Sequence, residues 1–235
     1  MEDTVTDQRG SVTVNLPESL LLLAIDDDTG EISSQMRSAD FGTAGAVLLE
    51  LFIAGKLQIV DGNVRIIDST MTGDPLLDDA VALIRASDKP RDAKHWVKKL
   101  ADAKIMNQVL DQLIARDIVR SEEHRLLWII PVNRFPAENR EPEDDLRAKL
   151  RSIVIDNQPP DVHSAALIGL LKATDLTGAV FSKSERKDYR ERIDGIANGD
   201  LLSGAVAKLI KDAQNAMTAA IVAAVIVPTV TASST

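Results

Sequence analysis

The fold is decided first by residues 72–84, which read Thr72-Gly73-Asp74-Pro75-Leu76-Leu77-Asp78-Asp79-Ala80-Val81-Ala82-Leu83-Ile84. Asp74 is suited to cap the free backbone N–H groups of a helix, and Pro75 suits the first helical position because it has no N–H to leave unpaired. Asp78 and Asp79 fall in the early turns, where a carboxylate meets the positive end of the helix dipole. The apolar residues recur at helical spacing and predict one buried face: Leu76, Leu77, Ala80, Val81 and Ile84.

Helical periodicity also marks most of the remaining chain. Aromatic residues make up only 3% of it, so the core must be built from Leu, Ile, Val and Ala, which favours helices packed on helices. The fold class we expect is mainly α: a single helical-bundle domain wrapped by amphipathic helices. The apolar end of the segment 201–227 is predicted to be a buried central helix. The other helical segments are 16–25, 41–55, 90–100, 106–114 and the succession that starts at Pro142.

Two segments predict short β-hairpins instead of helices. The segment 57–67 contains two β-rich runs around Asp61-Gly62, a pair typical of a tight two-residue turn. The second predicted hairpin joins strands 118–120 and 126–130 through the polar turn 121–125. Trp128, which aliphatic residues flank, fits either core packing or an exposed membrane or subunit contact.

The composition of the 235-residue chain, with 45% hydrophobic and 27% charged residues, is that of a soluble globular protein. Cysteine is absent, which excludes disulfides and fits a reducing cytoplasm. The formal charge of −9 disfavours a broad electrostatic grip on nucleic acid, so no nucleic-acid partner is expected. We see no secretory signal, and the apolar run 219–227 is too short to span a membrane. We therefore expect a cytoplasmic protein whose membrane contact is peripheral, on the inner face.

The chain has no pattern of catalytic or metal-binding residues. His95, His124 and His163 lie in different segments without paired ligand spacing. A Gly-rich phosphate loop and a nucleophile elbow are both missing. The acids of 26–28 indicate a turn, because the spaced ligands and distal Glu of a calcium loop are not there. We therefore predict a protein that is not an enzyme and has no catalytic residue, metal or cofactor.

The clearest basic cluster lies in the predicted helix that follows Pro90. It comprises Arg91, Lys94, Lys98 and Lys99. Clusters of this kind are most often solvated helix faces, and that is the ordinary interpretation here. The net negative charge does not exclude the other interpretation, a small local basic patch.

Several uncommon strings follow one another along the chain: Leu16-Pro17-Glu18 with Leu20 to Ile25, Asp28-Thr29-Gly30, Gly45 to Leu51, Thr72 to Asp78, Lys94-His95-Trp96-Val97, and Leu113 to Val119. In this order they resemble the Golgi phosphoprotein 3 family, in its bacterial branch. The resemblance implies a single mostly α-helical domain with a projecting β-hairpin. It also implies recognition of phosphatidylinositol 4-phosphate at a membrane surface and, in eukaryotic members, an adaptor role for Golgi enzymes.

The resemblance also places the family's headgroup site, which uses a tryptophan and an arginine near one helix start and two arginines on a later helix. The first two positions hold Gln35 and Ala44 here, and the later pair falls near Ala103 and Met106. None of the four family residues is kept, so an altered site is expected. The candidate lipid headgroup residues are Gln35 and the two nearest cations, Arg37 and Lys104.

The apolar tip of the family's projecting hairpin corresponds to Leu127, Trp128 and Ile129. The family uses this hairpin for membrane contact or subunit packing. A tryptophan suits an interface between apolar and wet surroundings. These three residues are therefore the candidate membrane or subunit contact, through which a protein partner or self-association is expected.

Together, the residues and the resemblance predict a domain over 12–228, flanked by tails at 1–11 and 229–235. We expect a non-enzymatic peripheral membrane or adaptor protein whose partner is an anionic phospholipid headgroup. The alternative is a soluble winged-helix-like regulator or interaction module without lipid binding, because helix 105–116 precedes an apolar two-stranded wing. That helix carries only Lys104 and Arg116 as cations, with Asp111 between them.

Overall fold

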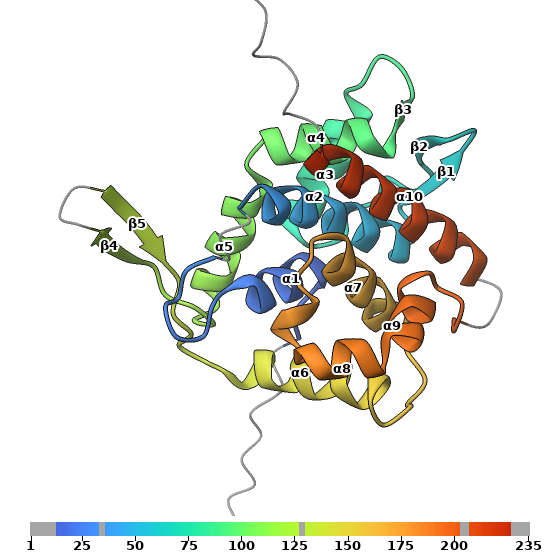
Figure 1. Ribbon diagram of the computed structural model, residues 1–235. Helices are drawn as coiled ribbons and strands as arrows, with labels where there is room; N and C mark the ends of the chain where they lie inside the picture. Colours follow the sequence, from blue (N-terminus) through green and yellow to red (C-terminus); the bar gives the residue numbers. More distant parts are fainter. Residues whose placement is uncertain (1–12, 33–35, 127–129, 203–206, 227–235) are drawn as a thin grey trace, which may run out of the picture.

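The computed structural model describes residues 13–32, 36–126, 130–202 and 207–226 (Figure 1). The protein is mainly α-helical, which confirms the expected fold class. Helix α2 (Met36–Ile53) lies in the middle and packs against α1 (Leu16–Ala24), α4 (Ala93–Asp102), α7 (Val162–Ala173) and α10 (Ala207–Ile226). The core is correspondingly aliphatic, as the scarcity of aromatic residues predicts.

Helix α1 is buried along its whole length because its sequence is apolar on nearly every side. Asn15 caps it by accepting the Glu18 N–H, while the Glu18 side chain accepts the Asn15 N–H and completes a capping box. The neighbouring helices approach each other closely. A Cβ atom at Gly45 of α2 would lie 2.6 Å from the Ile221 Cδ1 atom of α10, so a larger residue would displace the Ile221 side chain.

Helix α3 (Pro75–Arg85) begins where the stretch 72–84 predicts. Asp74 Oδ1 accepts the Leu76 N–H at 2.9 Å, and Pro75 occupies the first turn. Asp78 Oδ1 accepts the Thr72 N–H at 2.7 Å and so ties the preceding loop to the helix. The five buried residues of α3 are those that the periodicity predicts: Leu76, Leu77, Ala80, Val81 and Ile84.

The first predicted hairpin is confirmed. Strands β1 (Leu57–Val60) and β2 (Asn63–Ile66) pair antiparallel, with Val60 opposite Asn63. Asp61 and Gly62 both have positive φ angles, 51° and 75°, as a turn that matches the strand twist requires. A short strand, β3 (Arg91–Asp92), pairs with β2 and leads directly into α4.

The second hairpin differs from the prediction. Its strands are β4 (Glu122–Leu126) and β5 (Ile130–Arg134), so the predicted polar turn 121–125 is wrong and is mostly strand. The predicted strand 118–120 precedes the sheet; there Val119 makes one isolated bridge to Ala137. A two-stranded ribbon that projects into water, as in Figure 1, can carry polar residues on both faces, which conceals the strand from a hydrophobicity pattern. Leu127, Trp128 and Ile129 lie outside the described residues.

The second half of the chain is helical, as expected from Pro142 onward. Helix α10 buries Ala213, Met217 and Ile221 against the bundle, while Val222 is exposed. Two short helices, which Tyr189 separates, span residues 183–197. Among the described residues, no helix combines the length and apolarity needed to cross a membrane. The remaining elements are α5 (Ile105–Ala115), α6 (Glu141–Val154), η1 (Thr177–Ala179), α8 (Lys183–Asp188) and α9 (Arg190–Ala197).

Candidate functional site

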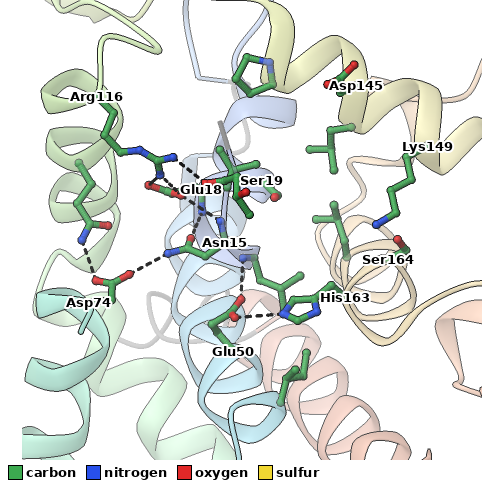
Figure 2. A pocket seen from close by; sticks show the side chains of 18 of the residues that line it. Asn15, Glu18, Ser19, Glu50, Asp74, Arg116, Asp145, Lys149, His163 and Ser164 are labelled. Carbon is green, nitrogen blue, oxygen red and sulfur yellow. Dashed lines mark hydrogen bonds and ion pairs between the residues drawn. The ribbon is translucent and has the colours of Figure 1, made fainter. Parts of the chain in front are cut away.

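A wide, open-sided cavity of about 1220 Å³ lies where the first turns of α1, α3 and α7 meet α5 and α6 (Figure 2). Its walls combine aliphatic side chains with a set of charged groups. Three helices begin here, and the side chain of its N-cap residue caps each one: Asn15 caps α1, Asp74 caps α3 and Asp161 caps α7. The residues that start these helices therefore also line the cavity.

The most deeply buried charge of the cavity is the Glu18 carboxylate, which is only 2% exposed. Arg116 Nη1 donates to both of its oxygens at 2.7 Å, and the Asn15 N–H donates to Oε2 at 3.0 Å. Arg116 Nη2 also donates to the Thr13 carbonyl oxygen at 2.6 Å. This pair joins the start of α1 to the end of α5 and satisfies a charge that burial would otherwise disfavour.

A second pair, Glu50 with His163, joins α2 to α7. Glu50 Oε2 accepts the Leu16 N–H at 2.8 Å, and Glu50 Oε1 lies 3.2 Å from His163 Nε2. The hydrogen bond to Glu50 raises the pKa of His163 above its ordinary value, although partial burial opposes the shift. On the α6 side of the cavity, Lys149 Nζ lies 2.7 Å from Asp161 Oδ2.

The Asp74 carboxylate differs from the ion-paired carboxylates above, because all of its hydrogen-bond donors are neutral. Its Oδ1 accepts from the Leu76 N–H and from Gln112 Nε2, and its Oδ2 accepts from Asn15 Nδ2, each at 2.9 Å. Asp145 on α6 is exposed and has no ion pair within the described part of the chain.

Acidic side chains outnumber basic ones around the cavity. Its lining includes five carboxylates, which are Glu18, Glu50, Asp74, Asp145 and Asp161. It includes two permanent cations, Arg116 and Lys149, and one histidine, His163. The cavity is therefore acidic.

The predicted headgroup residues lie elsewhere. Gln35 is outside the described residues, and Arg37 lies in the first turn of α2. Lys104 is exposed, in the left-handed conformation with φ of 56°, at the start of α5. Ala44 and Met106, which the resemblance sets at or near the expected headgroup positions, are buried in the core, at 0% and 6% exposure.

Next to Lys104, helix α4 presents the basic cluster that the sequence indicates. Ala93, Trp96, Val97 and Leu100 face the core. The opposite side exposes lysines, and Lys99 Nζ lies 5.5 Å from the Trp96 ring centroid. We call the cations here the basic face: Arg91, Lys94, Lys98, Lys99 and Lys104.

The electrostatics of the basic face differ from those of the cavity. Within the described ranges, none of its five cations takes part in an ion pair. Burial lowers the pKa of His95, and the charges of Arg91, Lys99 and Lys98 lower it further. Asp92, the N-cap of α4, opposes that shift, so positive charge outweighs negative charge around His95.

The fold and these surfaces define a helical protein with a projecting hairpin, a basic face and an acidic cavity. Residues 16–213 match the family model described as Golgi phosphoprotein 3 (GPP34). The chain therefore belongs to the Golgi phosphoprotein 3 family. The match extends from α1 into α10 and includes every string that carries the resemblance.

One curated relative is the vacuolar protein sorting-associated protein 74 of Eremothecium gossypii. It is 21% identical to this chain over 178 aligned residues, in an alignment that covers 66% of this chain and 53% of the relative. The chain therefore spans about half the length of the curated relative that it matches. Its name describes a protein of vacuolar sorting.

The sequence indicates the basic face but not the cavity. Asn15, Glu50, Asp74, Asp145 and His163 come from five separate segments. Each has a local explanation, as a cap or as part of an amphipathic helix, which leaves no signal of a shared site. Only the tertiary structure brings them together.

Proposed function

We propose that this chain is a non-enzymatic peripheral membrane protein or adaptor that binds an anionic lipid headgroup weakly. Membership of the Golgi phosphoprotein 3 family supports the general role. The single observation that carries the lipid contact is the basic face, whose cations are unpaired among the described residues. An otherwise acidic protein would thus be oriented with this face toward the membrane.

The binding free energy of this membrane contact follows from the number of lysines that reach the surface. Each Lys or Arg near an anionic membrane surface contributes about 1 kcal/mol, and the contribution falls off within a Debye length. Lys94, Lys98 and Lys99 can approach such a surface together because they lie on one side of α4. The contact is therefore expected to be weak and to be lost at high salt.

We infer that headgroup selection would involve Gln35, Arg37 and Lys104, the residues that the resemblance indicates for this role. The family's preference makes phosphatidylinositol 4-phosphate the first candidate. Charge-assisted hydrogen bonds supply most of the affinity for a phosphate, so the loss of the family's arginines predicts weaker selectivity. Leu127, Trp128 and Ile129 are proposed as the apolar contact with the membrane or with a protein partner.

Co-sedimentation with vesicles tests the lipid contact. Phosphatidylcholine vesicles alone would be compared with vesicles that also contain phosphatidylinositol 4-phosphate or cardiolipin, at low and at physiological salt. Binding should require the anionic lipid and should weaken with salt. Arg37→Ala should reduce the preference for the phosphoinositide, and Trp128→Ala should reduce binding to all anionic vesicles. No binding to any anionic vesicle at low salt would reject the proposal.

The alternative function is a winged-helix-like regulator, with α5 as the recognition helix and β4–β5 as the wing. Of its two flanking cations, Arg116 is already bound to Glu18, which leaves Lys104. A mobility-shift assay on mixed-sequence duplex DNA at low salt distinguishes the two proposals. We expect no shift; a salt-sensitive shift in the absence of vesicle binding would favour the regulator.

A further inference from the structure

One histidine, His95 of α4, lies in the middle of the basic face. It falls on the side of α4 opposite the buried residues, with Lys98 and Lys99 one turn further along the helix. Its imidazole stands edge-on to the Trp96 ring, with 5.2 Å between the ring centroids, and Lys99 Nζ lies 5.5 Å from the centroid of the same indole. The indole therefore holds the imidazole close to a lysine of the basic face.

The imidazole of His95 can gain or lose a proton without breaking a contact of the fold. The residue is half-buried, and within the described residues its ring has no hydrogen-bond or ion-pair partner. Only its backbone N–H is bound, to Asp92 Oδ1 at 2.8 Å, as part of the cap of α4. His163 differs in this respect, because its Nε2 lies 3.2 Å from Glu50 Oε1.

Positive charges predominate around His95. Burial lowers its pKa from the ordinary value of 6.5, the charges of Arg91, Lys99 and Lys98 lower it further, and Asp92 opposes them. Asp102 is a further exposed acid, two turns along the same side of α4. In solution at neutral pH the imidazole is therefore uncharged.

The other elements packed against α4 change this balance little. Helices α2, α5 and α10 contact α4, and none of their charges is among those that chiefly shift the pKa of His95. The charged residues that these three helices carry are Arg37, Asp40, Glu50, Asp111, Lys208, Lys211 and Asp212.

An anionic membrane would favour the protonated form of His95. Lipid phosphates that approach the basic face offset the repulsion from the neighbouring cations, and an opposite charge nearby stabilises the charged form of an imidazole. Linkage is reciprocal, so a proton that binds more tightly in the membrane-bound state also strengthens membrane binding.

We propose that His95 makes the lipid contact of the basic face dependent on pH, so that binding to an anionic membrane strengthens as the pH falls from 7.5 to 5.5. This inference rests on the membrane contact proposed above and adds its regulation. At the higher pH the face presents its five permanent cations, and at the lower pH a sixth positive charge joins them beside Lys98 and Lys99. One more cation near an anionic surface contributes about 1 kcal/mol, which corresponds to a gain of up to about fivefold in partitioning.

Partitioning of the full chain to vesicles at the two pH values tests the proposal. The vesicles contain phosphatidylcholine and phosphatidylglycerol, because a phosphodiester keeps its charge over this range, whereas a phosphomonoester has its second ionisation at about pH 6. At low salt, wild type should bind severalfold more tightly at pH 5.5 than at pH 7.5. The gain should shrink at physiological salt, because the added charge is screened.

Two substitutions at one position separate the charge of His95 from its packing. His95→Gln has no titrating charge, so it should bind at the weaker level at both pH values. His95→Lys has a permanent cation, so it should bind at the stronger level at both. His163→Gln is the matched control; it removes a titrating imidazole from the cavity and should keep the pH dependence of wild type.

NMR titration of the imidazole protons gives a second readout that needs no variant. Short-chain phosphatidylglycerol should raise the pKa of His95 and leave that of His163 nearly unchanged, as the reciprocity of linkage requires.

Two results would overturn this inference and leave the membrane contact standing: equal binding by wild type at the two pH values, or an undiminished pH dependence in His95→Gln. If neither wild type nor His95→Lys bound anionic vesicles at either pH, the membrane contact itself would be rejected, and this inference with it.

Discussion

The cavity and the basic face of α4 concentrate opposite charges in one acidic protein, and the two regions use them differently. In the cavity, Glu18, Glu50, Asp74 and Asp161 each accept hydrogen bonds that start a helix or join two helices. On the basic face, no cation has an ion pair in the part of the chain that the structure describes. A charge fixed by the fold contributes to stability, whereas a charge left unpaired remains available for a partner.

Two lysines show the same contrast on a smaller scale. Lys56 is buried, and its Nζ donates to Asp68 Oδ2 at 2.7 Å and to Thr70 Oγ1 at 2.6 Å. Lys99 is exposed, and its Nζ lies over the Trp96 ring, 5.5 Å from the ring centroid. Substitutions of fixed and unpaired charges should therefore have separable effects on stability and on binding.

The largest effect on stability is expected from Arg116→Met. This substitution leaves the buried Glu18 carboxylate with the Asn15 N–H as its remaining donor, and a buried charge that loses its partner costs about 2 kcal/mol or more. Urea denaturation monitored by circular dichroism measures the loss. Lys98→Met on the basic face is the control and should change stability by less than about 0.5 kcal/mol. Equal losses in the two variants would contradict the distinction between fixed and unpaired charges.

An intermediate effect is expected from Lys56→Met. The pKa of Asp68 is lowered from 3.8 to about 2, chiefly by the hydrogen bond from Lys56 and then by those from the Thr70 N–H and hydroxyl. Because the folded-state pKa is depressed, this contribution to stability is present above the unfolded pKa and is lost as pH falls through about 2. In Lys56→Met the pKa of Asp68 should rise toward 3.8, measured by carboxyl-carbon NMR titration. Lys99→Met should leave the Asp68 titration unchanged.

The smallest effect is expected from His163→Gln. The Glu50 hydrogen bond raises the pKa of His163, and Asp161 adds to the shift, while burial and Lys149 oppose it. Because the folded-state pKa is raised, the contribution is full below the unfolded pKa and is lost as pH rises through the folded pKa. His163 is about half exposed, so the difference in unfolding free energy between wild type and variant should be a few tenths of a kcal/mol at pH 5.5 and close to zero at pH 8.5. If the difference in unfolding free energy were larger at pH 8.5 than at pH 5.5, the direction of the His163 pKa shift would be contradicted.

The sequence predicts local structure well where one segment carries the whole signal. The cap, first turn and buried face of α3 all follow from residues 72–84, and the Asp61-Gly62 turn follows from two residues that tolerate positive φ. The sequence misplaces the β4–β5 hairpin because four of the five residues of β4 are polar. Periodicity detects a strand only when one of its faces is buried.

The cavity could not be predicted, because its chemistry depends on partners far apart in the chain. Asp74 indicates a helix cap, and nothing near it in the sequence indicates Asn15 or Gln112 as further donors. The same limit applies to the basic face. The sequence shows the lysines of α4, whereas their lack of ion pairs in the described residues depends on which side chains the fold places around them.

The most direct test of the central claim compares two variants with the same net charge. Lys98→Gln/Lys99→Gln removes two of the five cations of the basic face. Lys183→Gln/Lys187→Gln removes two exposed lysines of α8, at the opposite end of the molecule in Figure 1. Partitioning to vesicles of phosphatidylcholine with phosphatidylinositol 4-phosphate is measured for both. The α4 variant should bind roughly tenfold more weakly than wild type or worse, at about 1 kcal/mol per lysine, and the α8 variant should bind almost as wild type does. Equal binding by the two variants would contradict the assignment of membrane contact to the basic face.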